Sequence, residues 1–228
     1  MPIYYGVSFD QAYANVGYAV LSWNSDTNET KYLESGTFSP SMKLGHFSDT
    51  LAYLEHMKFI KDFFKRVEKE YGNIVCTSVE GVALGAPGQA SARGGIFGIY
   101  STMCVSKADL IIISPKKLKS FITGNGNAEK EEIAEILFKK YGEEGLTEES
   151  IETYDQTDAV GLGEIGLYCW RYMQKDQKAL EKELNPLQQQ IIWGNAPVKK
   201  KHKSFPDKQF GICTRIDDFY MFKRGNKK

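Results

Sequence analysis

The sequence has no apolar run that approaches the length of about 18 residues needed to cross a bilayer. Its first residues, MPIYYG, lack the basic start and the long apolar stretch of a signal peptide. These absences argue against a membrane protein and a secreted protein. We therefore expect a soluble intracellular protein that does not contact the membrane, either cytoplasmic or associated with the nucleoid.

Cysteine is scarce, and no two cysteines form a CxxC pair. This scatter fits neither a zinc site nor a dense disulfide framework. We expect the thiols to be reduced and mostly buried. The four positions are Cys76, Cys104, Cys169 and Cys213.

No linker rich in Pro, Gly or Ser divides residues 1–175, so we expect one domain there and an extension at 176–228. The formal net charge of zero hides an asymmetry: residues 185–228 hold ten Lys or Arg against three Asp, net +7, and residues 1–184 are net −7. The basic run in this extension is either a solvated loop or a contact for a polyanion. Its lysines are Lys199, Lys200, Lys201 and Lys203.

Hydrophobic periodicity predicts a mixture of strands and helices. We expect strands at 3–9, 16–23, 31–38, 74–79 and 110–113, and helices at 48–72, 89–100, 127–141 and 154–173. The first three strands form a meander. The first helix is expected to turn one apolar face to the sheet, formed by Leu51, Leu54, Met57, Ile60, Phe63, Phe64 and Val67. Ala159, Gly163 and Gly166 form a small-residue strip that would let the last helix approach the sheet closely.

Four acidic residues occupy the ends of these elements. Asp10 ends the first strand, Glu80 ends the fourth, and Asp155 and Asp158 lie on one face at the start of the last helix. Each also has an ordinary explanation. Asp10 could form a turn, Glu80 could be a surface acid, and the Asp pair could cap its helix.

A loop with two glycines, Gly124-Asn125-Gly126, precedes the third helix, for which Asn127 is a reasonable N-cap. Backbone amides at a helix start, together with ammonium groups, make an anion site. The lysines around this loop are Lys116, Lys117, Lys119 and Lys130.

Four motifs in this order resemble the RuvC-type Holliday-junction resolvases, which belong to the ribonuclease-H-like nucleases. They are Asp10 followed by Gly17-Tyr18, Glu80 in VEGV with Ala92-Arg93-Gly94 beyond it, TGNGNAEKEEI at 123–133, and DQTDAVGLG at 155–163. The resemblance covers about residues 3–173. It implies an α/β fold with a ribonuclease-H-like mixed five-stranded sheet flanked by helices, followed here by the basic C-terminal extension.

The resemblance implies that Asp10, Glu80, Asp155 and Asp158 bind metal and, with Lys130, form the catalytic site. Clustered acids cannot all stay ionised without cations between them, and oxygen ligands select Mg²⁺ or Mn²⁺, here two ions per site. Basic residues that would contact DNA are Arg93, Lys116, Lys117, Lys119 and Lys130, with Lys199, Lys200, Lys201 and Lys203 in the extension.

We therefore predict a divalent-metal-dependent endonuclease that resolves Holliday junctions as a homodimer, with 5′ phosphate and 3′ hydroxyl products. One departure is the short loop after Glu80, with Ala83 and Leu84 where bacterial members carry an aromatic. Alternatives are a less selective nuclease for flaps and forks, and a catalytically silent nucleic-acid-binding module. An actin-like nucleotide-binding protein would need a second phosphate loop and a duplicate domain that this length does not hold.

Overall fold

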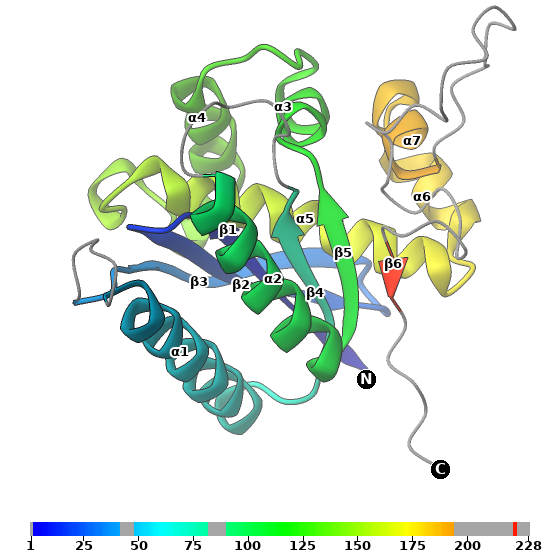
Figure 1. Cartoon of the computed structure of the whole chain (residues 1–228). Coiled ribbons are helices and arrows are strands. Elements are labelled where there is room, and N and C mark those ends of the chain that lie inside the picture. Colours follow the sequence, from blue (N-terminus) through cyan, green and yellow to red (C-terminus); the bar gives the residue numbers. More distant parts are fainter. Residues whose placement is uncertain (1, 42–47, 82–89, 194–220, 223–228) are drawn as a thin grey trace, which may run out of the picture.

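The computed structural model describes residues 2–41, 48–81, 90–193 and 221–222 (Figure 1). Its elements are β1 (Ile3–Gln11), β2 (Val16–Asn24), β3 (Glu29–Phe38), α1 (Ser48–Glu70), β4 (Ile74–Glu80), α2 (Ala90–Lys107), β5 (Asp109–Ile113), α3 (Pro115–Thr123), α4 (Lys130–Tyr141), η1 (Gly142–Glu144), η2 (Glu148–Ser150), α5 (Tyr154–Met173), α6 (Gln177–Glu183), α7 (Pro186–Trp193) and β6 (Met221–Phe222).

The strands form one mixed sheet in the order β3-β2-β1-β4-β5-β6. β1, β2 and β3 are antiparallel because short turns join them, whereas β4 and β5 run parallel to β1 because each follows a helical crossover. This confirms the predicted mixed sheet of five strands. The two-residue β6 adds a sixth strand, drawn from the extension, which pairs antiparallel with β5.

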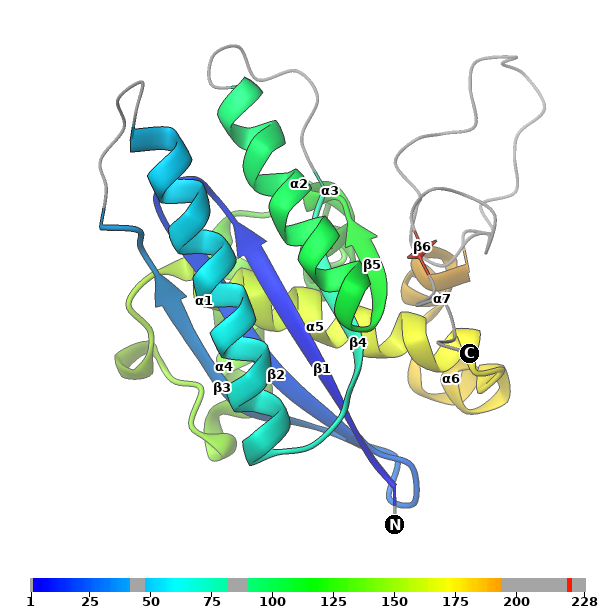
Figure 2. The same ribbon diagram turned by 60° about the horizontal axis from the view of Figure 1, so that its bottom comes forward.

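Helices cover both faces of the sheet. α1 and α2 lie side by side on one face (Figure 2), and α5 crosses the other face against β1, β2 and β4. Each interface has its own apolar core, with Val7 and Phe9 packed toward α1 and α2, and Leu21 and Leu162 on the α5 side. The sheet is therefore the middle layer of three, and its described ends carry the functional side chains discussed below.

α1 is apolar on its sheet-facing side only in its second half. Ile60, Phe63, Phe64 and Val67 are buried there, as predicted. The expectation was wrong for the first half, because Leu51, Leu54 and Met57 are 44%, 54% and 41% exposed. This part of α1 extends past the surface that the sheet offers.

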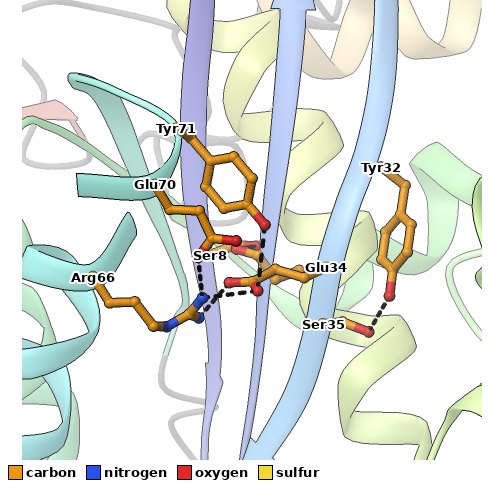
Figure 3. Close-up of polar contacts among 8 residues, drawn as sticks. Ser8, Tyr32, Glu34, Ser35, Arg66, Glu70 and Tyr71 are labelled. Atoms are coloured by element: carbon orange, nitrogen blue, oxygen red, sulfur yellow. Dashed lines mark hydrogen bonds and ion pairs between the residues drawn. The ribbon is translucent and has the colours of Figure 1, made fainter. Parts of the chain in front are cut away.

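Polar contacts fasten the C-terminal half of α1 to the edge strand β3 (Figure 3). The Arg66 guanidinium contacts both carboxylate oxygens of Glu34, with Nη1 2.9 Å from one of them, and it also reaches Glu70 at 3.1 Å. The Tyr71 hydroxyl lies 3.5 Å from the same Glu34 carboxylate. These contacts fix the edge of the α1 layer.

The small residues of α5 let it lie very close to the sheet, as predicted. A Cβ on Gly163 would lie 2.8 Å from Ser8 Oγ, and one on Gly166 would lie 2.4 Å from Ser78 Oγ. The Ser8 hydroxyl donates a 2.7 Å hydrogen bond to the carbonyl of Ala159. α5 is consequently buried along nearly its whole length.

Several elements differ from the expectation. α4 begins at Lys130 with Glu129 as its N-cap, so the predicted start at Asn127 was wrong. α3, α6 and α7 were not predicted; α3 begins with Pro115 and buries only Leu118 and Phe121, too few positions for a clear period.

The extension is partly folded onto the domain. Leu180, Ile191 and Ile192 of α6 and α7 are buried in the α5-side core. Cys76, Cys104 and Cys169 are buried as predicted, whereas Cys213 lies outside the described residues. Within the described ranges, no helix combines the length and the apolar character that crossing a membrane requires.

Candidate metal centre

The sheet brings the two strand-end acids together. β1 and β4 are parallel neighbours whose pairing ends at Phe9 and Val79, so the next residues, Asp10 and Glu80, leave the same edge of the sheet side by side. Their convergence follows from the parallel pairing of strands that are some seventy positions apart in the sequence.

The start of α5 reaches the same edge through a glycine. Gly17 is the β2 partner of Asp10. A Cβ at Gly17 would lie 1.9 Å from the carbonyl oxygen of Asp155, so only glycine permits this approach. The absent side chain thus places Asp155 and Asp158 next to Asp10.

Three of the four predicted acids meet at one point. One carboxylate oxygen each from Asp10, Asp155 and Asp158 lies within 4.8 Å of the others. Asp10 and Asp158 are buried, with 7% and 4% of their surfaces exposed, and Asp155 is partly buried. Glu80 lines the same cleft, which has a volume of about 470 Å³.

Lys130, the first residue of α4, places its ammonium among these carboxylates. Its Nζ lies 2.7 Å from Asp155 Oδ1, 2.9 Å from Asp158 Oδ2 and 3.8 Å from Asp10 Oδ2. Burial opposes the charged form of this lysine, but the charges of Asp158, Asp155 and Asp10 outweigh burial and raise its pKa. Lys130 therefore stays cationic and offsets part of the acidic charge.

One cation does not neutralise the cluster. Burial, followed by the negative charge of Glu80, raises the pKa of Asp10 well above its usual range. Burial and the charge of Asp158 raise the pKa of Glu80 to about 7. Burial also raises the pKa of Asp158, even though Lys130 acts in the opposite direction. The protein thus holds more buried negative charge at this point than its own side chains compensate.

The donor set fits a hard divalent cation. Asp158 Oδ1 is buried and finds no hydrogen-bond partner among the described residues. A buried carboxylate oxygen without a partner is costly unless it meets a ligand. Oxygen-only ligands suit Mg²⁺, Mn²⁺ or Ca²⁺ better than softer metals.

Some of the predicted basic residues also lie at this cleft. Lys119 and Arg93 line it together with Lys130. Lys119 donates a hydrogen bond to the carbonyl of Ala128. Lys116 and Lys117 lie on α3 but do not line the cleft, and Lys116 is exposed.

Other parts of the predicted basic surface are not formed or not described. At the start of α4, the amides of Glu129 and Glu132 each bond to the carboxylate of the other residue in a capping box. The anion site expected from backbone amides at this helix start is therefore not available. Lys199, Lys200, Lys201 and Lys203 lie outside the described residues.

Three cleft residues escaped the sequence analysis. Tyr13 and Phe97 form apolar parts of the wall, and Gln11 lies beside Asp10. Aromatic residues at these positions read as ordinary core, and nothing in the local sequence marks Gln11. Its role depends on a contact with Glu80, 69 positions away.

No protein-family model matches the chain, and no curated protein matches it at a significant level. Solved structures do. A structure of Thermus thermophilus RuvC matches with a TM-score of 0.57 and 14% identity, over 75% of this chain and 96% of that one. The T. thermophilus RuvC in complex with Holliday junction substrate matches with a TM-score of 0.54 and 14% identity, over 70% of this chain and 90% of that one.

This chain is similar in fold to RuvC. Because these identities are low, the likeness establishes the architecture, with its mixed sheet and flanking helices. The chemistry is argued from the cleft itself.

Proposed function

We propose that this protein is a divalent-metal-dependent endonuclease that resolves Holliday junctions by paired phosphodiester cleavage. The observation that carries the proposal is the meeting of three aspartate carboxylates within 4.8 Å at the mouth of a RuvC-like sheet. Surplus buried acid in a cleft is typical of sites that bind a cation for chemistry. The similar RuvC structure with Holliday junction substrate supports DNA of this kind as the substrate.

In this proposal Asp10, Glu80, Asp155 and Asp158 hold one or two Mg²⁺ or Mn²⁺ ions. When bound, such ions supply an activated water and stabilise the departing 3′ oxygen of the scissile phosphate. The acids orient the ions. The expected products carry a 5′ phosphate and a 3′ hydroxyl.

The basic residues of the cleft have a separate task. Lys119 and Arg93 line its walls, where they can neutralise backbone phosphates on either side of the scissile bond. Lys130 contacts the acids directly. An ammonium at this position offsets charge that develops on the phosphate in the transition state.

The test uses labelled synthetic four-way junctions, flaps, forks and duplexes, each with and without Mg²⁺. Paired, symmetric nicks in the junction are the expected result. Equal cleavage of flaps and forks would favour the less selective nuclease, and metal-independent binding without cleavage would favour a silent binding module. Asp158→Asn and the exposed Asp26→Asn serve as site and surface controls.

We also propose a homodimer. A four-way junction offers two symmetric strands, and a two-fold enzyme presents two sites to them. The exposed Leu51, Leu54 and Met57 of α1 are large apolar residues of the kind that association buries. Sedimentation equilibrium should show a dimer that Leu54→Lys weakens; a wild-type monomer at all concentrations would contradict this.

The lysines of the extension are proposed to contact a DNA arm. Changing Lys199, Lys200, Lys201 and Lys203 to Gln should weaken binding to all junction sequences similarly, because phosphate contacts carry no sequence information. The salt dependence of affinity should flatten by about 0.9 per lost phosphate contact. An unchanged slope would remove these lysines from the DNA interface.

A further inference from the structure

Gln11, the last residue of β1, binds Glu80 with both ends of its side-chain amide. Its Nε2 donates to the Glu80 carbonyl, and its Oε1 accepts from the Glu80 N–H at 3.0 Å. The backbone pairing of β1 with β4 has already ended at Phe9 and Val79. The amide of Gln11 therefore takes the place of the peptide group that would extend this ladder by one more step.

Glu80 is also fixed from its other side. The N–H of Gly81 donates a 2.7 Å hydrogen bond to the carbonyl of Ile113 on β5. Without Gln11, the contact with β5 would remain, but the side of Glu80 that faces Asp10 would lose its backbone partner. Gln11 is thus the link that ties this strand end to β1.

This link matters because Gln11 is covalently attached to Asp10. We propose that Gln11 is a positioning residue that sets the separation of the Asp10 and Glu80 carboxylates for metal binding. The inference rests on the proposed function, since it assigns Gln11 a role at the same metal site. Both carboxylates line one cleft and carry like charge, so they repel each other until a cation binds. A hydrogen-bonded tether resists that repulsion.

The alternative is that Gln11 only stabilises the end of the sheet. In that case its loss would lower stability and leave metal affinity unchanged. A positioning role predicts a loss of metal affinity of about 10- to 100-fold, as is typical for residues that orient metal ligands.

The experiment compares Gln11→Met with Gln188→Met. Met keeps the length of the side chain and removes both hydrogen bonds. Gln188 is a matched control because its amide donates to the Phe121 carbonyl at 3.1 Å and accepts from the Asn185 N–H at 3.1 Å, yet it does not line the cleft. Mn²⁺ binding is measured by calorimetry without DNA, and thermal unfolding is measured in parallel.

We expect Gln11→Met to weaken Mn²⁺ binding by at least about 10-fold, and Gln188→Met to bind Mn²⁺ as the wild type does. Cleavage of junctions by Gln11→Met should recover at saturating Mn²⁺, because the residue positions ligands and performs no chemistry. If Gln11→Met does not fold, Gln11→Asn gives the same readout, since it keeps the amide but shortens its reach by one methylene.

The two proposals fail in different ways. Wild-type Mn²⁺ affinity in a folded Gln11 variant overturns the positioning role and leaves the nuclease proposal intact when the wild type cleaves junctions. A wild-type protein that binds no Mn²⁺ and cleaves no DNA overturns both.

Discussion

The molecule buries charge in two places, and the two are built differently. Arg171 has a fully buried side chain whose guanidinium bonds Asp176 at 2.9 Å, Glu183 at 2.6 and 2.7 Å and Asn28 at 2.7 Å. It also stacks on Trp23, with Cζ 4.4 Å from the ring centroid. Every part of this cation has a partner, and its acids keep some contact with water.

The acidic cleft is unbalanced by comparison. Four carboxyl groups face a single ammonium, that of Lys130, and one buried oxygen, Asp158 Oδ1, has no partner among the described residues. A saturated ion cluster is typical of structural stabilisation, whereas uncompensated buried charge indicates a ligand. The contrast separates a structural site from a chemical one within a single chain.

The sharpest way to test this contrast is to remove one acid from the cleft. Asp158→Asn deletes a proposed metal ligand, so junction cleavage should fall more than about 100-fold, beyond the usual effect of a residue that only supports a ligand. Binding to the junction should persist or tighten, since repulsion of the phosphates is lower. Single-turnover cleavage and gel-shift titration measure the two effects.

The result is read against Asp26→Asn, an exposed aspartate in the turn after β2. That variant should cleave like the wild type. Full cleavage by Asp158→Asn would show that this carboxylate is not part of the chemistry.

The Arg171 cluster should respond in the opposite manner. Arg171→Met leaves Asp176 and Glu183 without their cation, so the free energy of unfolding should fall by about 3 kcal/mol, the lower end for a broken buried pair because both acids are partly exposed. Chemical denaturation measures the loss.

Metal affinity of the folded Arg171→Met protein should be unchanged. The matched control is Arg66→Met, whose surface ion pairs with Glu34 and Glu70 should be worth less than about 1 kcal/mol. A large change in Mn²⁺ affinity for Arg171→Met would join the two regions that we separate.

The acidic residues of the cleft could be predicted from the sequence because each ends an element that local patterns define. Strand and helix ends for Asp10, Glu80 and Asp158 follow from runs of apolar residues, and the parallel order of the strands brings those ends together. The short strip of small residues in α5 likewise predicted its close approach.

Other features depend on contacts that no local pattern contains. The Gln11 tether to Glu80 and the insertion of Lys130 among the acids each join distant segments. The exposed first half of α1 has the same periodicity as its buried half, so only the extent of the sheet decides which half is covered.

A smaller effect should appear as a dependence of stability on pH. Glu80 has its pKa raised from the ordinary 4.5 to about 7, so between these values the folded protein keeps a proton that the unfolded chain has lost. Metal-free stability should therefore fall as pH rises through this range, by no more than about 1.4 kcal/mol per pH unit from this group.

Glu80→Gln should remove this component. His56, whose pKa is lowered by burial, contributes the opposite slope below its ordinary value of 6.5, and it does so equally in both proteins. Subtracting denaturation free energies of the variant from those of the wild type at each pH isolates Glu80. Identical pH profiles would contradict the raised pKa.

The most direct test of the central claim is a Mn²⁺ titration of thermal unfolding, without DNA, for wild type and Asp158→Asn. If the surplus acids of the cleft form a metal centre, Mn²⁺ at a hundred times its dissociation constant should stabilise the wild type by about 2.7 kcal/mol. The variant should gain much less at the same concentration. Equal responses of the two proteins, or no response of the wild type, would contradict the account.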